Sequence, residues 1–234
     1  MNSRISRLVP ANVSKGMLCI VLVLGLIQAT ARAAVIFEDS FEGGLADGDF
    51  TFGANAADFP GPGWTHSGPG GAGITNPNST QAQPLHDTAL AAADRNAAFI
   101  QHVAGSAVTT NTGVAWEANT TYTLSFDYWT VNSSSTQPFL LEFRDGVGVV
   151  ASSTPTTLIG QTNFLTLNNA LSFTTGGAAP SGNVILRLTY QGDLQYMFDN
   201  VVIDAVAVPE PGCLTLLGSG FAGLVGLVRR RKRT

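Results

Sequence analysis

Alternation of apolar and polar side chains is the feature that most limits how residues 34–207 can fold. The segment 121–128 reads TYTLSFDY, so that its aromatic and aliphatic residues all fall on even positions. A period of two places each set of side chains on one face of an extended strand, whereas a helix needs a period near 3.6. The pattern predicts half-buried antiparallel strands.

The same alternation and strand-forming composition recur along the chain and are separated by the turn signals DG, GG, SGN and QGD. A long helical period is found only near the two termini. The sequence therefore predicts an all-β protein, an antiparallel β-sandwich of the jelly-roll type. Residues 43–95 are rich in Gly, Pro, Asn and Ala and are predicted to form long loops at one end of the sandwich. Further strands are predicted at 34–41, 97–103, 139–144, 147–152, 165–173, 184–191 and 196–206.

The C-terminal segment 208–234 combines a short polar motif, an apolar run and a basic block. The motif is Val208, Pro209, Glu210 and Pro211, and its prolines favour an extended, protease-accessible backbone. The apolar run 213–228 would be about 24 Å long as a helix, against about 30 Å for the hydrocarbon layer. Snorkelling by the first arginine of the block 229–233 shortens the deficit, and the block keeps the C-terminus in the cytoplasm. A single transmembrane helix is predicted.

This tripartite order resembles the PEP-CTERM sorting signal of bacteria that make exopolysaccharide, with Pro209, Glu210 and Pro211 as its triplet. The resemblance implies that the protein is exported and held transiently in the inner membrane. An exosortase then cuts near Val208–Pro211 and delivers the body to the cell surface or extracellular matrix. The alternative is a permanently anchored single-pass protein with an accidental Pro-Glu-Pro.

The N-terminus predicts export by the general secretory route. Basic residues precede an apolar core at 17–27, and Ala31-Arg32-Ala33 provides the small residues of a signal-peptidase site. The expected division is a signal peptide at 1–33, a β-sandwich at 34–207 and the sorting signal at 208–234. Both cysteines, Cys19 and Cys213, fall in the terminal signals, so the sandwich is expected to have no disulfide.

The predicted sandwich is strongly acidic. Between residues 34 and 207 only Arg95, Arg144 and Arg187 oppose fifteen acidic residues, a formal charge of −12. Such a surface excludes nucleic acid as a partner and favours divalent cations or neutral glycans.

A second resemblance rests on the segments IFEDSFE at 36–42, ANTTYTLSF at 118–126 and FDNV at 198–201. They resemble the corresponding parts of carbohydrate-binding, galactose-binding-like jelly rolls. The resemblance implies a structural Ca²⁺ held by Glu42, helped by Asp39, on the first strand and by Asp199 on the last. Calcium prefers hard oxygen ligands, and binding it would stabilise a domain without disulfides. The alternative is that Asp39 and Glu42 are solvated and Asp199 belongs to a strand turn.

Two tryptophans are candidates for ligand binding. Alternation places Trp129 on the polar face of its strand, with Asp127, and Trp64 lies in the Gly/Pro-rich segment. An exposed indole can stack on a sugar ring, although aromatic residues at strand ends also cover the edge of a core. Trp116 and Tyr190 are weaker candidates.

Catalytic chemistry has little support in the sequence. The three histidines have no metal or triad spacing, and the sandwich has no cysteine nucleophile. Glu142 and Asp145 would form a glycosidase pair only if they faced each other across a cleft. The predicted function is a noncatalytic surface or matrix protein that associates with exopolysaccharide. A secreted polysaccharide hydrolase and a ligand-free structural or adhesive module are the alternatives.

Overall fold

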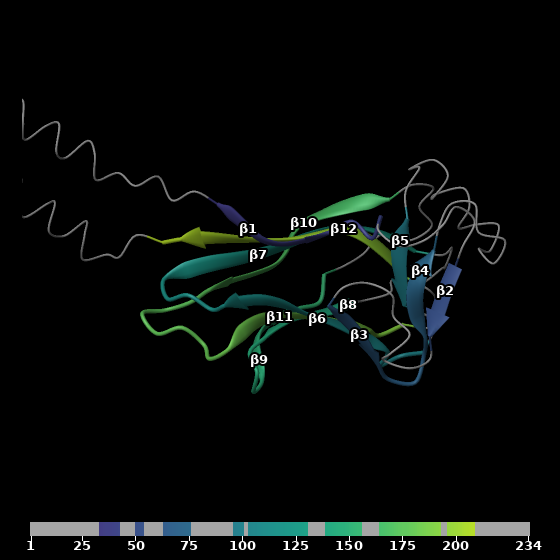
Figure 1. Cartoon of the computed structure of the whole chain (residues 1–234), viewed down its shortest axis with the longest axis horizontal. Helices are drawn as coiled ribbons and strands as arrows, with labels where there is room; N and C mark the ends of the chain where they lie inside the picture. The colour runs from purple at the N-terminus through teal and green to yellow at the C-terminus, as the bar shows by residue number, and fades with distance from the viewer. Residues whose placement is uncertain are drawn as a thin grey trace, which may run out of the picture. The chain divides into compact units, whose positions relative to one another are not determined.

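The computed structural model describes residues 33–42, 50–53, 63–75, 96–100, 103–130, 139–155, 164–192 and 196–208. All of them belong to one compact unit, Ala33–Thr234. The described residues form antiparallel strands in two sheets, which Figure 1 shows as two layers. The predicted antiparallel β-sandwich is therefore confirmed. The described ranges contain no helix, and so none that could cross a membrane, and both predicted apolar terminal segments lie outside these ranges.

The larger sheet has the order β10-β7-β12-β5-β4-β2, and β1 also pairs with β12. Its strands are β1 (Ala34–Asp39), β2 (Phe50–Gly53), β4 (Ala72–Thr75), β5 (Ala97–Ile100), β7 (Thr120–Thr130), β10 (Leu165–Thr174) and β12 (Tyr196–Ala207). The smaller sheet has the order β3-β6-β11-β8-β9. Its strands are β3 (Trp64–Ser67), β6 (Ala107–Ala115), β8 (Phe139–Arg144), β9 (Val149–Ser153) and β11 (Asn183–Tyr190).

Strand β12 organises the larger sheet. One edge pairs with β7 along the whole strand, from Tyr196 to Ala207. The other edge is shared: β5 pairs with residues 196–198 and β1 with residues 201–205. The register shifts between Asp199 and Val202, where Asn200 has a left-handed φ of 48°. Asn tolerates this backbone conformation better than other non-glycine residues do. The bulge thus falls where β1 ends and β5 begins.

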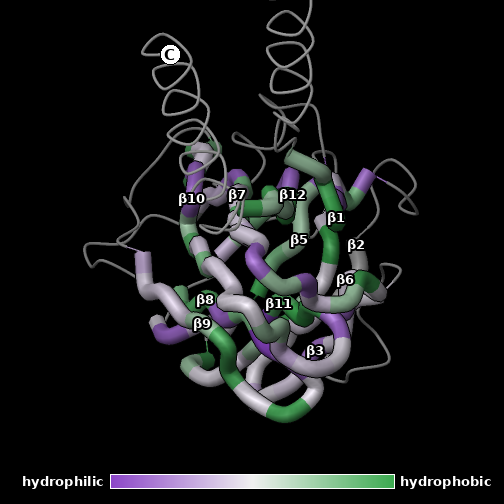
Figure 2. Tube along the Cα trace, turned by 90° about the vertical axis from the view of Figure 1, so that its left-hand side faces the viewer, coloured by the Kyte–Doolittle hydropathy of each residue, from purple (hydrophilic) through white to green (hydrophobic). Residues whose placement is uncertain are grey.

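The core lies between the sheets and follows the predicted alternation. On β7 the aromatic and aliphatic residues at even positions from Tyr122 to Tyr128 are buried, and their neighbours are half-buried. On β11 the same is true from Val184 to Tyr190. Edge-to-face contacts such as Trp116 on Tyr122, with ring centroids 4.6 Å apart, join the layers. Figure 2 shows hydrophobic residues distributed along the strands of both sheets.

Four strands were not predicted. β2, β3 and β4 lie inside residues 43–95, so the prediction of continuous loops there is wrong for those twelve residues. They are short, and β4 reads AGIT with all four residues buried, which leaves no alternation to detect. β6 reads AVTTNTGVA and directs Thr110 into the core in place of an apolar residue. Strand formation here depends on pairing with neighbours rather than on local pattern.

Candidate ligand site

A completely buried carboxylate lies near the start of β12. Asp199 has 0% of its surface exposed. By alternation it lies on the same face as Met197, which is the outer face of the larger sheet. Its Oδ1 accepts a hydrogen bond from the backbone N–H of Asn200 at 2.6 Å. A buried carboxylate must be protonated, paired with a cation or hydrogen-bonded, so this position is chemically demanding.

A second carboxylate lies directly opposite. Asp127 of β7 is the register partner of Asp199. Asp127 accepts a hydrogen bond from Thr166 Oγ1 at Oδ1, 2.6 Å away, and from Asn200 Nδ2 at Oδ2, 2.9 Å away. Asn200 therefore donates its backbone N–H to one carboxylate and its side-chain amide to the other. Like charges opposite each other destabilise a strand pair, and these donors offset that repulsion.

An apolar cluster adjoins the two carboxylates on the outer face. It consists of Ala97, Phe99, Trp129 and Met197, with Phe164 packed against it, and we call it the outer apolar cluster. Its members come from β5, β7 and β12, which the sheet brings side by side. The arrangement puts aromatic surface, a thioether and a buried acid within one small region. Apolar and aromatic side chains with a few polar groups are the usual lining of small-molecule sites.

The structure buries both candidate tryptophans, as the alternative of packing at the edge of a core predicts. Trp129 does lie on the face opposite Tyr128, as alternation predicted, but it is only 3% exposed because the outer apolar cluster surrounds it. Trp64 is also 3% exposed and belongs to the main core, as do Trp116 and Tyr190. None of them forms an open sugar platform in this structure. A role of Trp129 or Trp64 in ligand binding stays a prediction.

The three predicted calcium ligands have different surroundings. Asp39 accepts hydrogen bonds from the indole Nε1–H of Trp64 at 2.8 Å and from the backbone N–H of Phe41 at 2.9 Å. Glu42 is exposed and accepts the backbone N–H of Asn96 at 3.1 Å. Within the described ranges no group of three or more His, Cys, Asp or Glu side chains is placed to hold a metal. Asp39, Glu42 and Asp199 thus do not converge as a triad, and calcium binding stays a prediction.

The contacts of Glu142 and Asp145 do not fit a glycosidase pair, in which two carboxyl groups face each other across a cleft. Glu142 forms ion pairs with Arg144 and Arg187. Asp145 accepts the backbone N–H groups of Gly148 and Val147 at 2.7 and 2.8 Å, and these bonds hold its pKa below the usual value. A general acid needs a raised pKa, so Asp145 is tuned in the opposite direction.

Sequence reasoning missed two functional candidates and one buried base. The sequence indicated Trp129 but not Asp127 or the other members of the outer apolar cluster, although the run Met197-Phe198-Asp199 interrupts the polar alternation and could have indicated two buried faces. The spacing of His66 in the sequence suggests no role, yet it is 3% exposed, neither ring nitrogen has a hydrogen-bond partner, and burial lowers its pKa.

Comparison with known proteins agrees with this fold. The family model for HpiC1-like proteins, described as HpiC1 cyclase, matches residues 33–204, and the chain belongs to this family. The model for the PEP-CTERM protein-sorting motif matches residues 207–232, which confirms the predicted sorting signal and implies a terminal transmembrane segment in an exported protein. No curated protein sequence matches the chain significantly.

Solved structures show the same sandwich at low identity. The Stig cyclase Fisc from Fischerella sp. TAU, in complex with (3Z)-3-(1-methyl-2-pyrrolidinylidene)-3H-indole, is 21% identical over 76% of this chain and 100% of its own, with a TM-score of 0.57. A cyclase from the same source, in complex with 4-(1H-indol-3-yl)butan-2-one, is 18% identical over 74% of this chain and 96% of its own, with a TM-score of 0.54. The xylan-binding CBM22-1 domain from Paenibacillus barcinonensis is 16% identical over 77% of this chain and 100% of its own, with a TM-score of 0.48. The two cyclase structures, with TM-scores above 0.5, share the fold described above.

Proposed function

We propose that the protein is a noncatalytic surface or matrix protein that an exosortase releases and that then associates with exopolysaccharide. The main support is the junction between fold and sorting motif. β12 ends at Ala207, and the backbone N–H of Val208 still donates to the carbonyl oxygen of Asn119 at 2.6 Å. Cleavage beyond Val208 would therefore remove the tail without removing any residue of the sheet.

The mass of the protein recovered outside the cell tests this proposal. Processing predicts a species that begins near Ala34 and ends near Pro209–Pro211. A variant with Pro209→Ala and Pro211→Ala is expected to stay in the membrane fraction at full tail length. An extracellular species that still contains Thr234, or normal release of the double variant, would contradict exosortase processing.

Association with exopolysaccharide is supported by the export signals and by the hydroxyl and charged side chains on the outer face of the smaller sheet, and the acidic charge disfavours nucleic acid as the partner. The test is retention of the released protein on the polysaccharide of the producing bacterium, with the eluted polymer analysed for new reducing ends. Retention without new ends is the expected result. New reducing ends would indicate a hydrolase, and absence of retention would leave a structural or adhesive module.

Membership of the HpiC1-like family favours a second candidate, a cyclase that acts on an indole-bearing compound. In this proposal the outer apolar cluster holds the aromatic part of the substrate. Asp199, in its protonated form, donates a proton to a basic atom of the substrate and recovers it after ring closure. Complete burial of this carboxyl opposite the carboxylate of Asp127 favours the neutral form that this role needs.

Thermal shift with 4-(1H-indol-3-yl)butan-2-one separates the two candidates. The cyclase proposal predicts stabilisation of the wild-type chain and a loss of that stabilisation in Asp199→Asn, whereas Asp204→Asn, the same change on the same strand, keeps it. No shift with the wild-type chain would remove the reason to pursue cyclase chemistry. Retention on polysaccharide is measured on the same protein samples. That measurement tests the surface-protein proposal independently of the thermal-shift result.

A further inference from the structure

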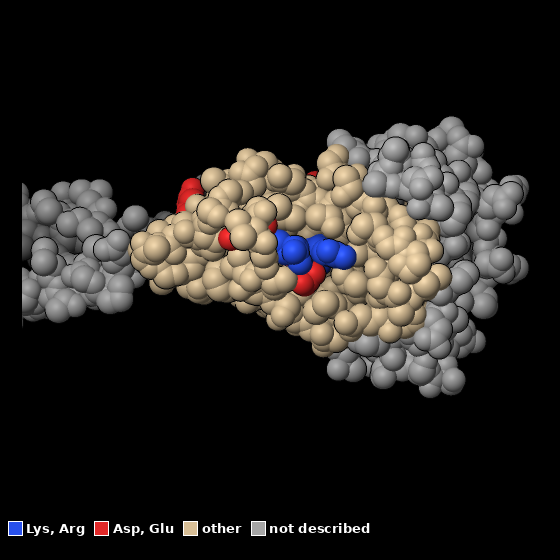
Figure 3. All heavy atoms as spheres, turned by 90° about the horizontal axis from the view of Figure 1, so that it is seen from below, with Lys and Arg blue, Asp and Glu red and all other residues tan. Residues whose placement is uncertain are grey.

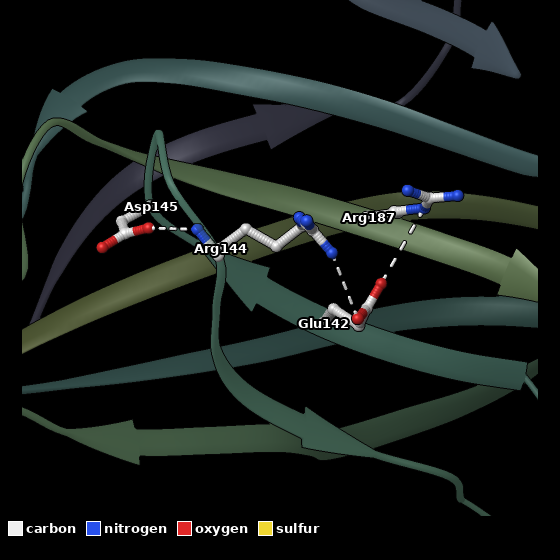
Figure 4. A network of polar contacts seen from close by, with 5 residues as sticks. Glu142, Arg144, Asp145 and Arg187 are labelled. Atoms are coloured by element: carbon white, nitrogen blue, oxygen red, sulfur yellow. Dashed lines mark hydrogen bonds and ion pairs between the residues drawn. The ribbon is translucent and has the colours of Figure 1, made fainter.

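The outer face of the smaller sheet has a compact charged group at its centre. Arg144 Nη1 lies 3.3 Å from Glu142 Oε1, and Arg187 Nε lies 3.8 Å from Glu142 Oε2. Glu142 and Arg187 are register partners on β8 and β11, and Arg144 is two residues from Glu142 on the same face. Figure 4 shows one nitrogen of each guanidinium group, Arg144 Nη1 and Arg187 Nε, facing this one carboxylate. We call Arg144 and Arg187 the arginine pair.

Most of the hydrogen-bonding capacity of the arginine pair is unused. Each guanidinium has five N–H donors. The structure gives the pair one side-chain hydrogen bond, from Arg144 to Glu142 at 3.3 Å. Arg187 Nε is buried without a hydrogen-bond partner, since 3.8 Å exceeds hydrogen-bond range. The arginine side chains are 28% and 31% exposed, whereas that of Glu142 is 11% exposed. An incoming acceptor can therefore reach the guanidinium groups while Glu142 remains beneath.

Hydroxyl side chains continue the face on both sides of the arginine pair. Pairing aligns one residue from each strand in a row that crosses the whole sheet: Thr65, Thr109, Arg187, Glu142 and Ser152. Five strands at a spacing of about 4.8 Å make this row roughly 19 Å long. A row of hydroxyls beside two cations matches an extended chain that offers hydroxyl groups and periodic anionic groups.

The positive charge of the arginine pair is unusual in this strongly acidic domain. Between residues 34 and 207 there are three basic and fifteen acidic residues. Arg144 and Arg187 are the basic residues among those that the structure describes, and Figure 3 shows them as one blue patch with red beside it. With Glu142 the group keeps one net positive charge. A strongly acidic domain repels an anionic polymer in general, so an anionic ligand would have to be recognised locally.

We propose that the arginine pair binds the carboxylate of a uronic-acid residue in an acidic exopolysaccharide, with the flanking threonines and serine contacting sugar hydroxyls. The fork of an arginine matches the two oxygens of a carboxylate, which favours this group over a neutral sugar. The proposal rests on the proposed association with exopolysaccharide and names the class of polymer and the surface that binds it.

Binding of the full chain, purified in detergent, to immobilised polygalacturonate tests the proposal without requiring export or tail cleavage. Methyl-esterified polygalacturonate has the same sugars without the charge and is the matched polymer control. We expect retention on the acid polymer and at least tenfold weaker retention on the ester. Arg187→Gln and Arg144→Gln should each weaken binding by about tenfold, and Arg187→Lys should restore only part of it.

Glu142→Gln gives the sharpest result. Removal of the competing carboxylate should strengthen binding, whereas Asp204→Asn makes the same charge change on the other sheet and should leave binding unchanged. Unfolding temperatures show whether each variant is folded, and the arginine variants provide the test if Glu142→Gln is not. Equal retention on acid and ester, unchanged binding by folded Arg187→Gln, or weaker binding by folded Glu142→Gln would each overturn the proposal. Failure of exosortase processing would leave these results unaffected.

Discussion

Asp39 provides a test of how the first strand is held to the core. Its carboxylate accepts the indole N–H of Trp64 at 2.8 Å and the backbone N–H of Phe41 at 2.9 Å. The Trp64 ring lies between Phe37 and Phe198, with centroid distances of 6.0 and 5.9 Å. The hydrogen bond to Asp39 thus fixes a buried aromatic group that contacts both β1 and β12.

Asp39→Ala should destabilise the fold by about 3 kcal/mol. A hydrogen bond to a charged group contributes about 1.5–3 kcal/mol, and a buried donor left without an acceptor costs about 1–3 kcal/mol. Trp64 and Phe41 are both only 3% exposed, so both donors lose their acceptor in surroundings from which water is largely excluded. In a domain of this size, 3 kcal/mol corresponds to a fall of about 6–12 °C in the unfolding temperature.

Urea unfolding of Asp39→Ala, Trp64→Phe and the double variant measures the coupling between the two side chains. We expect the effect of Asp39→Ala to shrink by about 2 kcal/mol once Trp64 is Phe, because the donor is gone. A loss below about 0.5 kcal/mol, or an equal loss in both backgrounds, would refute this account. Repeating the series with a calcium chelator separates the hydrogen-bond role from a ligand role, since only a calcium ligand would lose its effect.

Three further predictions use other parts of the fold. Burial lowers the pKa of His66 below its usual 6.5, so the unfolded chain binds the proton more readily, and stability should fall as the pH drops below about 6.5. His66→Leu should weaken that dependence in urea unfolding at pH 7.5 and 5.0, and an unchanged slope would contradict it. Gly68 has φ +106°, and an added Cβ would lie 2.5 Å from the carbonyl oxygen of Gly105, so Gly68→Ala should cost more than about 2 kcal/mol. Gly105→Ala, at φ +92° with open space around its Cβ, should cost clearly less, and equal losses would show that the steric contact does not matter. If calcium is bound, a chelator should lower the unfolding temperature of the wild-type chain but not of Glu42→Gln, as calorimetry can show; an equal decrease in both would exclude Glu42.

Alternation alone predicted the strands whose two faces differ. β7 and β11 bury one face and leave the other partly exposed, so the alternation in their sequences predicts both that they are strands and which face is buried. β4 is buried on both faces, and β6 places Thr110 in the core, so neither has a readable period. In those strands the conformation is determined by partners distant in the sequence.

The candidate site also depends on contacts between strands that are distant in the sequence, which alternation within one strand cannot predict. Alternation put Trp129 on the correct face, but whether that face is open depends on Phe99 from β5 and Met197 from β12. Asp127 and Asp199 are 72 positions apart in the chain and become opposite neighbours only through the β7-β12 register. The hydrogen bonds of Asn200 to both carboxylates depend in turn on the bulge that follows Asp199. A site assembled from three strands and one bulge cannot be read from any single segment.

The junction at Val208 links the fold to the proposed processing. Ala207 is still paired with Thr120, and the next residue donates its N–H to Asn119, which has a left-handed φ of 51°. Asn119 can adopt this conformation at low cost, so the turn before β7 presents its carbonyl oxygen to the departing chain. Pro209, which has no N–H, follows at once, and the backbone pairing has no donor with which to continue. The sheet therefore ends at the residue where the sorting motif begins, and a protease can act on Pro209–Pro211 without opening β12.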